Sequence, residues 1–140
     1  MKHRRLGKHG PMISPIGIGA MSFSNFYGRT SEADSHAILN TALDEGVTHI
    51  DTADIYGPLT SEEVIGSFLA RQGPQRNDMF SIATKAGIAR DANTGKRYFD
   101  NSAAYLESCL DASLTRLGVD HVDLFYVHRR DADTPIEEVA

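Results

Sequence analysis

The chain alternates short apolar runs with longer amphipathic stretches, and this order restricts its possible fold more than any other feature of the sequence. The apolar runs predict four strands, at residues 16–19, 49–51, 79–84 and 122–127. Stretches with apolar residues at helical spacing separate them and predict helices that begin near Ser31, Thr60 and Asn101. Strand–helix units repeated every roughly 30 to 40 residues are typical of βαβ units. The sequence therefore predicts an α/β fold with a parallel sheet.

Two of the predicted helices carry a start signal. Ser31 with Asp34, and Thr60 with Glu63, have the spacing of a capping box. In a capping box, the side chains at the two positions each accept a hydrogen bond from the other residue's backbone N–H. We therefore expect both pairs to define the first turn of their helices.

Two connecting segments have their own patterns. Residues 4–6 and 12–14 flank a segment with two glycines and a proline, which predicts a β-hairpin ahead of the first strand. Residues 85–100 surround the turn sequence Asn93-Thr94-Gly95 and predict a long polar loop. The hairpin would thus precede the first strand, and the loop would lead to the third helix.

Composition supports one soluble globular domain. Of the 140 residues, 41% are hydrophobic and 24% are charged, as in ordinary folded proteins. A formal net charge of −5 disfavours binding to the phosphates of nucleic acid. The single cysteine, Cys109, cannot form an internal disulfide, and no apolar run is long enough to span a membrane. We therefore expect a cytoplasmic protein that binds neither nucleic acid nor membranes.

Three of the predicted strands end in a titratable residue: Asp51, Lys85 and His128. Parallel βα folds gather the carboxyl ends of their strands on one rim, where active sites form. Tyr56, in the loop after Asp51, can lean over the same rim. A carboxylate, an amine, a phenol and an imidazole together can transfer protons. Taken singly, these residues also have structural interpretations, as a turn aspartate, a solvated lysine, a packed tyrosine and a histidine paired with Asp131.

Two features near the first strand bear on ligand binding. Gly17-Ile18-Gly19 begins like a dinucleotide-binding fingerprint, but Ser22 stands where the third glycine would be. We therefore expect these glycines to permit close backbone approach. The aromatic residues Phe23, Phe26 and Tyr27 could form one apolar wall of a substrate pocket, or they could pack locally.

A metal site near the strand ends is the weaker alternative. Its ligands would be two histidines and two aspartates, namely His49, Asp51, His128 and Asp131. The sequence has no His-x-His pair and only one cysteine, so the spacing typical of metal ligands is missing. We therefore expect no metal.

The last residues begin a helix. Thr134-Pro135-Ile136-Glu137 combines a capping residue, a proline suited to the first helical position and an acid at capping-box spacing. A helix of about one turn is not stable alone, and an apolar parallel strand at a sheet edge invites further pairing. We therefore expect residues 1–140 to be a fragment of a longer fold, or half of a fold that closes by association.

Several stretches of the chain have recognisable motifs. They are, in order, RRLGKHGPMISPIGIGAMSF, GVTHIDTADIYG, SIATKAG, VDLFYVHRRD and TPIEEVA. They resemble the bottom hairpin and first strand, the aspartate–tyrosine motif, the lysine strand, the histidine strand and the next helix of the aldo-keto reductase family. That family's fold is an eight-stranded parallel βα barrel, a type that typically needs about 250 residues. The resemblance implies the first four βα units of a TIM-type (β/α)8 barrel, a half barrel preceded by a β-hairpin.

The resemblance also implies a reaction, the NADPH-dependent reduction of aldehyde or ketone carbonyls in small molecules. Tyr56 would donate a proton to the carbonyl oxygen, and the cation of Lys85 would make that phenol a better acid. Asp51 would pair with Lys85 and hold it in place. His128 would orient the carbonyl and share in proton transfer. These four residues are the expected catalytic group.

The cofactor implied by the resemblance is NADP(H). Gly19, Ala20 and Met21, together with Asp51, would contact its ribose and nicotinamide end. In the family, most of the contacts that bind the cofactor come from later strands and loops. Correct positioning can account for about 7 to 11 kcal/mol of a reaction barrier. We therefore expect the 140-residue chain to be nearly inactive by itself.

Two other functions stay open. The chain could be a non-catalytic half barrel that associates through its open sheet edges, with two copies pairing around a two-fold axis. Lys85 could instead form a Schiff base with a carbonyl substrate, as in a lyase. Sedimentation tests the first alternative, and borohydride trapping on Lys85 tests the second.

Overall fold

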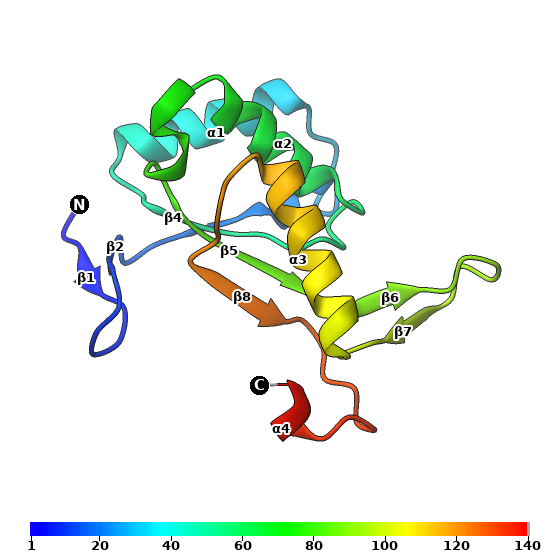
Figure 1. Cartoon of the computed structure of the whole chain (residues 1–140). Coiled ribbons are helices and arrows are strands. Elements are labelled where there is room, and N and C mark those ends of the chain that lie inside the picture. Colours follow the sequence, from blue (N-terminus) through cyan, green and yellow to red (C-terminus); the bar gives the residue numbers. More distant parts are fainter. Residues whose placement is uncertain (140) are drawn as a thin grey trace.

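The central feature of the fold is a four-stranded parallel sheet (Figure 1). A computed structural model of the chain describes residues 1–139, without the side chains of residues 76 and 77. The sheet order is β3-β4-β5-β8, formed by Ile18–Gly19, His49–Asp51, Ser81–Ala86 and Leu124–Val127. Each sheet strand therefore lies beside the one that precedes it in the chain, as in one half of a βα barrel.

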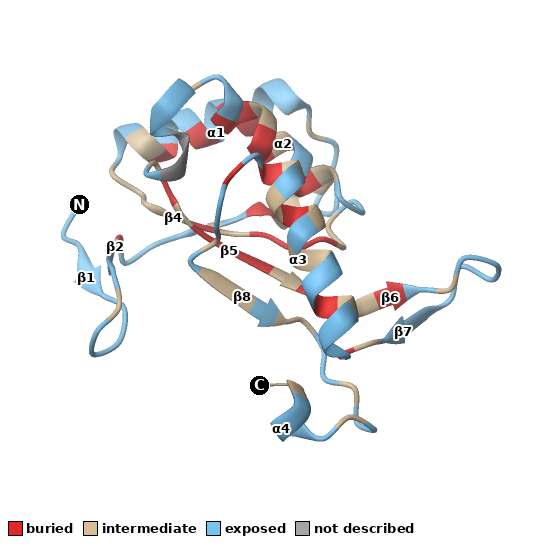
Figure 2. Cartoon of the chain, in the orientation of Figure 1, coloured by how far each residue is buried: buried red, intermediate tan, exposed pale blue. Residues whose placement is uncertain are grey.

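Three helices connect these strands and cover one face of the sheet (Figure 1). They are α1 (Glu32–Asp44), α2 (Thr60–Ala70) and α3 (Ala103–Leu117). The core between the two layers is apolar and includes Leu39, Ile50, Ile65, Phe68, Leu69, Ile82 and Leu117. Figure 2 shows buried positions concentrated where the helices meet β4 and β5. Within residues 1–139, no helix is long and apolar enough to cross a membrane.

Short elements surround this core. One antiparallel hairpin joins β1 (Arg4–Arg5) to β2 (Met12–Ile13), and a second joins β6 (Ile88–Arg90) to β7 (Arg97–Phe99). The second hairpin extends past the end of β5 (Figure 1). The remaining elements are the 3₁₀ helices Ala20–Ser24 and Gly73–Asn77 and the short helix α4 (Ile136–Val139).

The predicted order of a hairpin, four parallel strands and three intervening helices is confirmed, although several boundaries differ. The first sheet strand begins at Ile18 instead of residue 16, and β5 continues to Ala86, so Lys85 lies inside the strand. The fourth begins at Leu124 instead of residue 122. Just before it, the Asp123 carboxylate accepts the Ile82 N–H at 2.8 Å, and the Asp123 N–H donates to the carbonyl of Ile82 at 2.9 Å. Asp123 is therefore bound to β5 through both its side chain and its backbone.

The polar loop predicted for residues 85–100 is wrong. This segment completes β5 and then forms the β6–β7 hairpin, in which Arg90 and Arg97 are direct cross-strand partners. The Asp91 carboxylate closes the turn by accepting the Thr94 N–H at 2.7 Å. The available signal for the hairpin was the Asn-Thr-Gly turn between two short segments that contain apolar residues, Ile88 and Ala89 before it and Tyr98 and Phe99 after it.

The two predicted capping boxes have different outcomes. The box of Ser31 and Asp34 is confirmed, with each backbone N–H bonded to the other residue's side chain at 3.1 Å. The box of Thr60 and Glu63 is wrong, because α2 has Leu59 at its N-cap, with a φ of 66° and no side-chain cap. A tight turn closed by the Leu59 N–H places Thr60 inside the first helical turn, so its hydroxyl is not in a capping position.

The third helix begins at Ala103, with Ser102 as its N-cap, and Asn101 has another structural role. Asn101 is 1% exposed. Its Nδ2 donates to the carbonyl of Arg129 at 3.1 Å, and its Oδ1 accepts the Asp131 N–H at 2.5 Å. Asn101 therefore anchors the segment that follows β8.

The open side of the sheet differs from the covered side. β3 and β8 are the edge strands, and β8 was expected to be covered on both faces. Within the described residues Tyr126 of β8 is 42% exposed, and Leu124 is only partly buried. The sheet therefore has one face without helices and two edges that accept no further strand from residues 1–139.

A buried ion pair joins α2, α3 and β5. Glu62 has an exposure of 0%, and its Oε2 accepts the Arg116 Nε–H at 2.7 Å. Its Oε1 accepts the hydroxyl of Thr84 at 2.5 Å. A Cβ at Gly66 would overlap the backbone of Arg116, so only glycine permits this close approach of α2 and α3. The pair thus lies at the contact of three elements.

Asp54 is a second buried acid near this ion pair. It is 8% exposed, and its Oδ1 has no hydrogen-bond partner among the described residues. The pKa of Asp54 is raised from 3.8 to about 6, mainly by burial and also by the nearby Glu62 carboxylate, and Arg116 opposes this rise. Between about pH 4 and 6, the folded protein therefore keeps a proton on Asp54 that the unfolded chain has lost. The free energy of unfolding falls as the pH rises through that range.

We expect Asp54→Asn to raise the free energy of unfolding at pH 7, because it removes a buried charge and preserves the shape. The gain should grow between pH 4 and 7 and reach about 2–3 kcal/mol, since one pKa unit corresponds to about 1.36 kcal/mol. Urea unfolding over this pH range measures the gain, with the exposed Asp44→Asn as control. An equal gain at pH 4 and pH 7 would contradict the raised pKa.

Candidate active site

The carboxyl ends of the sheet strands bring together the residues predicted as catalytic. Asp51 is the last residue of β4, Lys85 is next to last in β5, and His128 directly follows β8. The His128 N–H donates to the carbonyl of Ala86 at 2.7 Å, which holds it level with the end of β5. Tyr56 lies in the loop between β4 and α2. All four residues therefore lie at one end of the sheet.

The amine of Lys85 is the centre of this group. Its Nζ donates to Asp51 Oδ1 at 2.5 Å, to the carbonyl of Thr52 at 2.6 Å and to the hydroxyl of Tyr56 at 3.3 Å. These bonds use all three N–H donors of a lysine ammonium. The cation is thus held between a carboxylate and a phenol, as predicted for the pair of Asp51 and Lys85.

Tyr56 and His128 face each other across the site. Their ring centroids are 5.8 Å apart, and the rings are nearly perpendicular at 82°. Lys85 Nζ lies 4.9 Å from the Tyr56 ring centroid. The loop that carries Tyr56 requires glycine at Gly57, where φ is 100° and a Cβ would lie 2.7 Å from Thr60 Cβ. The turn thus directs the phenol back toward the strand ends.

The surroundings of His128 lower its pKa and so favour the neutral imidazole. Burial lowers the pKa of His128, the nearby cations of Lys85 and Arg129 lower it further, and Asp51 raises it. Its Nδ1 is buried without a hydrogen-bond partner in the described part of the chain, so it does not pair with Asp131. A neutral imidazole carries one N–H donor and can orient a carbonyl oxygen.

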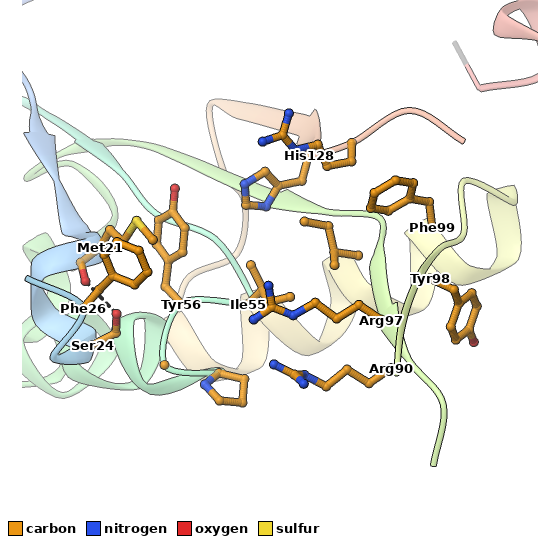
Figure 3. A pocket seen from close by; sticks show the side chains of 14 residues that line it. Met21, Ser24, Phe26, Ile55, Tyr56, Arg90, Arg97, Tyr98, Phe99 and His128 are labelled. Carbon is orange, nitrogen blue, oxygen red and sulfur yellow. Dashed lines mark hydrogen bonds between the residues drawn. The ribbon is translucent and has the colours of Figure 1, made fainter. Parts of the chain in front are cut away.

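A cavity of about 710 Å³ opens beside Tyr56 and His128 (Figure 3). Near the two rings its lining is mostly apolar and includes Met21, Phe26 and Ile55. An apolar wall next to a proton donor and an imidazole suits a small organic substrate.

The three aromatic residues after the first strand do not form one wall. Phe26 lines the cavity and contacts Tyr27 edge-on, with ring centroids 5.0 Å apart. Phe23 is 2% exposed and packs in the core. Tyr27 is 75% exposed, and its hydroxyl contacts Met21 Sδ at 3.8 Å. Only Phe26 therefore contributes to the cavity wall.

Similarity to known proteins extends over nearly the whole chain. A family model described as "Aldo/keto reductase family" matches residues 15–140. The chain belongs to the aldo/keto reductase family. It is 41% identical over 127 residues to "Aldo-keto reductase yakc (NADP(+))" from Schizosaccharomyces pombe, covering 91% of this chain and 37% of that protein. It is 36% identical over 135 residues to "Probable aldo-keto reductase 1" from Glycine max, covering 96% and 38%.

Solved aldo/keto reductase structures share the fold. The aldo-keto reductase AKR11C1 from Bacillus halodurans (holo form) has a TM-score of 0.84 and 32% identity, over 99% of this chain and 44% of that one. A putative aldo-keto reductase from Pseudomonas aeruginosa has a TM-score of 0.77 and 34% identity, over 94% and 48%. The chain thus spans less than half of these relatives. The predicted TIM-barrel architecture, present here as a half barrel, is confirmed.

Four residues of this aldo/keto reductase chain are predicted to contact the cofactor, and three are accessible. Gly19 is exposed opposite Asp51 in the sheet, and a Cβ there would meet nothing within 4 Å. Met21 lines the cavity. Ala20 is fully buried, and its carbonyl accepts the Ser61 hydroxyl at 2.8 Å. Gly19 and Met21 thus leave an open surface near Asp51, while Ala20 is part of the core.

A metal centre finds no support in the described residues. Within residues 1–139, no group of three or more histidine, cysteine, aspartate or glutamate side chains is arranged to hold an ion. Asp51, which the alternative would need as a ligand, is already bonded to Lys85. The described contacts of Asp51 are thus those of an ion-pair partner of Lys85.

Two residues that line the cavity were missed by the sequence analysis, Arg90 and Arg97. Figure 3 shows their side chains extending from the β6–β7 hairpin toward Ile55. They were hidden because the segment was interpreted as a loop, in which side-chain direction cannot be inferred. Once the strands are recognised, the direct pairing of Arg90 with Arg97 places both arginines on one face of the hairpin.

Proposed function

We propose that this chain is the amino-terminal part of a single barrel domain that reduces aldehydes or ketones with NADPH. The observation that supports this most directly is the position of the Lys85 amine, bonded to both Asp51 and the hydroxyl of Tyr56. The His128 ring faces Tyr56 from the other side. The phenol of Tyr56 and the imidazole of His128 thus line the cavity, and the Lys85 cation contacts the phenol.

The chemistry assigned to each residue follows from its contacts. Tyr56 donates its phenolic proton to the carbonyl oxygen as that oxygen gains negative charge. The ammonium of Lys85 stabilises the phenolate that remains, because opposite charges attract strongly in a partly buried site. Asp51 holds the ammonium in position, and the N–H of His128 orients the carbonyl. When bound, NADPH supplies the hydride that reduces the carbonyl carbon.

Further barrel strands, outside these residues, would hold most of the cofactor. The chain covers 37% of its Schizosaccharomyces pombe relative, and α4 begins the helix that would follow the fourth barrel strand. Correct positioning of the reactants can account for about 7 to 11 kcal/mol of a reaction barrier. We therefore expect the complete protein that contains this chain to reduce benzaldehyde at least about 100-fold faster than residues 1–140 alone. The loss of NADPH fluorescence measures turnover.

The two proteins in this experiment test different parts of the proposal. Equal turnover by both would show that the half barrel positions the cofactor unaided. No turnover by the complete protein, across a panel of aldehydes and ketones, would contradict the reductase assignment. A cytoplasmic location stays an expectation from the sequence, and fractionation of cells tests it.

Of the two alternative functions, the structure disfavours the Schiff-base lyase and favours self-association. A Schiff-base lyase needs a free amine lone pair, whereas the Lys85 Nζ donates to three acceptors, which disfavours this chemistry. Self-association is favoured by the edge strands β3 and β8, which pair with nothing beyond the sheet in residues 1–139. Sedimentation of the isolated chain separates a monomer from an associated half barrel.

A further inference from the structure

Two arginines face each other on the β6–β7 hairpin beside the catalytic residues. Arg90 and Arg97 are direct cross-strand partners, and like charges directly opposite each other destabilise an antiparallel pair. Within residues 1–139 neither forms an ion pair, and Arg90 reaches only the carbonyl of Gly95, at 3.5 Å. An anion between the two guanidinium groups would relieve this repulsion.

The cavity lining has the opposite charge to the rest of the chain. Its lining includes Arg90, Arg97 and Arg129 and no aspartate or glutamate, although the chain has 19 acidic and 14 basic residues. A cleft lined by one sign of charge concentrates ligands of the other sign. The cavity is therefore suited to an anion.

Along the hairpin, an apolar cross-strand pair lies between the end of β5 and the charged pair. Ile88 and Phe99 are the cross-strand pair nearest to the end of β5, and the Arg90–Arg97 pair lies two residues further along. Both pairs line the cavity, which agrees with the period of two along a strand. Two residues of a strand span about 7 Å. A ligand extending from Tyr56 and His128 along this face would thus meet an apolar surface first and then two cations.

We infer that Arg90 and Arg97 bind an anionic group at the far end of the carbonyl substrate. This inference rests on the proposed function, because the carbonyl end is the one reduced at Tyr56. The substrate class is an aldehyde or ketone with an aromatic or short aliphatic body and a terminal carboxylate or phosphate. Guanidinium groups suit such anions because they donate paired, charge-assisted hydrogen bonds.

A phosphate of the cofactor would also suit the same arginines, because a phosphate accepts the same charge-assisted hydrogen bonds as a carboxylate. The two sources of the anion predict different effects of substitution. A site for the substrate's anion changes the preference between charged and uncharged substrates. A site for the cofactor's phosphate changes the dissociation constant of NADPH equally for both.

The test compares 4-carboxybenzaldehyde with its uncharged methyl ester as substrates of the complete protein. We expect the carboxylate to have a kcat/KM at least about tenfold higher, as two charge-assisted contacts allow. In the double variant Arg90→Gln/Arg97→Gln, this ratio should fall to about 1, mainly because KM for the carboxylate rises. Arg4→Gln is the matched control, because Arg4 is exposed on the β1–β2 hairpin and does not line the cavity. Its ratio should equal that of the unsubstituted protein.

Three results would overturn the inference. The first is an equal or higher kcat/KM for the ester in the unsubstituted protein. The second is an unchanged preference in the double variant. The third is weaker NADPH binding by the double variant with the preference preserved, which would assign the arginines to the cofactor.

A binding measurement separates this inference from the proposed function. If neither substrate is reduced, the reductase assignment fails, and calorimetric titration with benzene-1,4-dicarboxylate still tests the anion site. Binding that weakens at least tenfold in the double variant, with Arg4→Gln unchanged, would support the site. No binding to the unsubstituted protein would overturn it.

Discussion

Replacing Tyr56 with phenylalanine is expected to lower kcat for carbonyl reduction by about 10² to 10⁴-fold, the contribution of a positioned general acid. The substitution removes only the hydroxyl that contacts the Lys85 amine at 3.3 Å. The ring remains, so its perpendicular contact with His128 is preserved. NADPH consumption by the complete protein measures the loss, and single-turnover kinetics separates chemistry from product release.

Two controls show whether this loss comes from proton transfer. Tyr105→Phe removes a hydroxyl from α3, outside the cavity lining, and should leave kcat unchanged. The dissociation constant of NADPH should be similar for Tyr56→Phe and the unsubstituted protein. A Tyr56→Phe variant with full kcat would rule out this phenol as the proton donor.

Replacing Arg116 with methionine is expected to lower the free energy of unfolding by about 3–5 kcal/mol, as when one partner of a buried ion pair is removed. The variant would leave the Glu62 carboxylate at 0% exposure with only the Thr84 hydroxyl as a hydrogen-bond partner among its present contacts. Guanidinium chloride unfolding followed by circular dichroism measures the change. Loss of α2–α3 packing should accompany it, because the pair lies where these helices meet.

An exposed ion pair of the same chemistry provides the matched control. Arg71 pairs with Glu32 at 3.4 Å, and its side chain is 67% exposed. Arg71→Met should cost less than about 1 kcal/mol, since exposed ion pairs contribute little. A second variant, Glu62→Leu with Arg116→Met, should recover part of the loss because it leaves neither member of the pair buried as an unpaired charge. Equal losses for the two single arginine variants would contradict a special role for the buried pair.

The strand-end residues could be predicted because parallel βα order fixes which ends of the strands meet. To predict that Asp51, Lys85 and His128 lie together, it was enough to recognise the apolar runs before them and to apply the rule that the carboxyl ends of the strands share a rim. The contact between Tyr56 and Lys85 needed more, because it depends on the turn through Gly57. Sequence spacing placed the phenol near the rim but could not give its direction.

The hairpin and its arginines were missed for a physical reason. Strands β6 and β7 have three residues each, too short for alternation to stand out from a loop. Their pairing depends on the Asp91 side chain that closes the turn, a local hydrogen bond that competes well with open loop conformations. Charged residues in such a segment are naturally interpreted as solvated.

The buried ion pair could not be predicted either. Glu62 and Arg116 are 54 residues apart, and each lies on an amphipathic helix where charged residues normally face water. Only the crossing of α2 and α3 at Gly66 encloses them. Helix periodicity gives the faces of each helix, whereas this contact depends on how two helices approach.

The one-sided core has a consequence for biosynthesis. Every residue of the core, including those packed around it, lies between Ile18 and Val122, and the sheet strands pair in chain order. Nascent chains emerge from the ribosome amino terminus first, at about 5 to 20 residues per second. The helix-covered layer can therefore condense cotranslationally, which leaves the bare face of the sheet and the β8 edge exposed in the nascent protein.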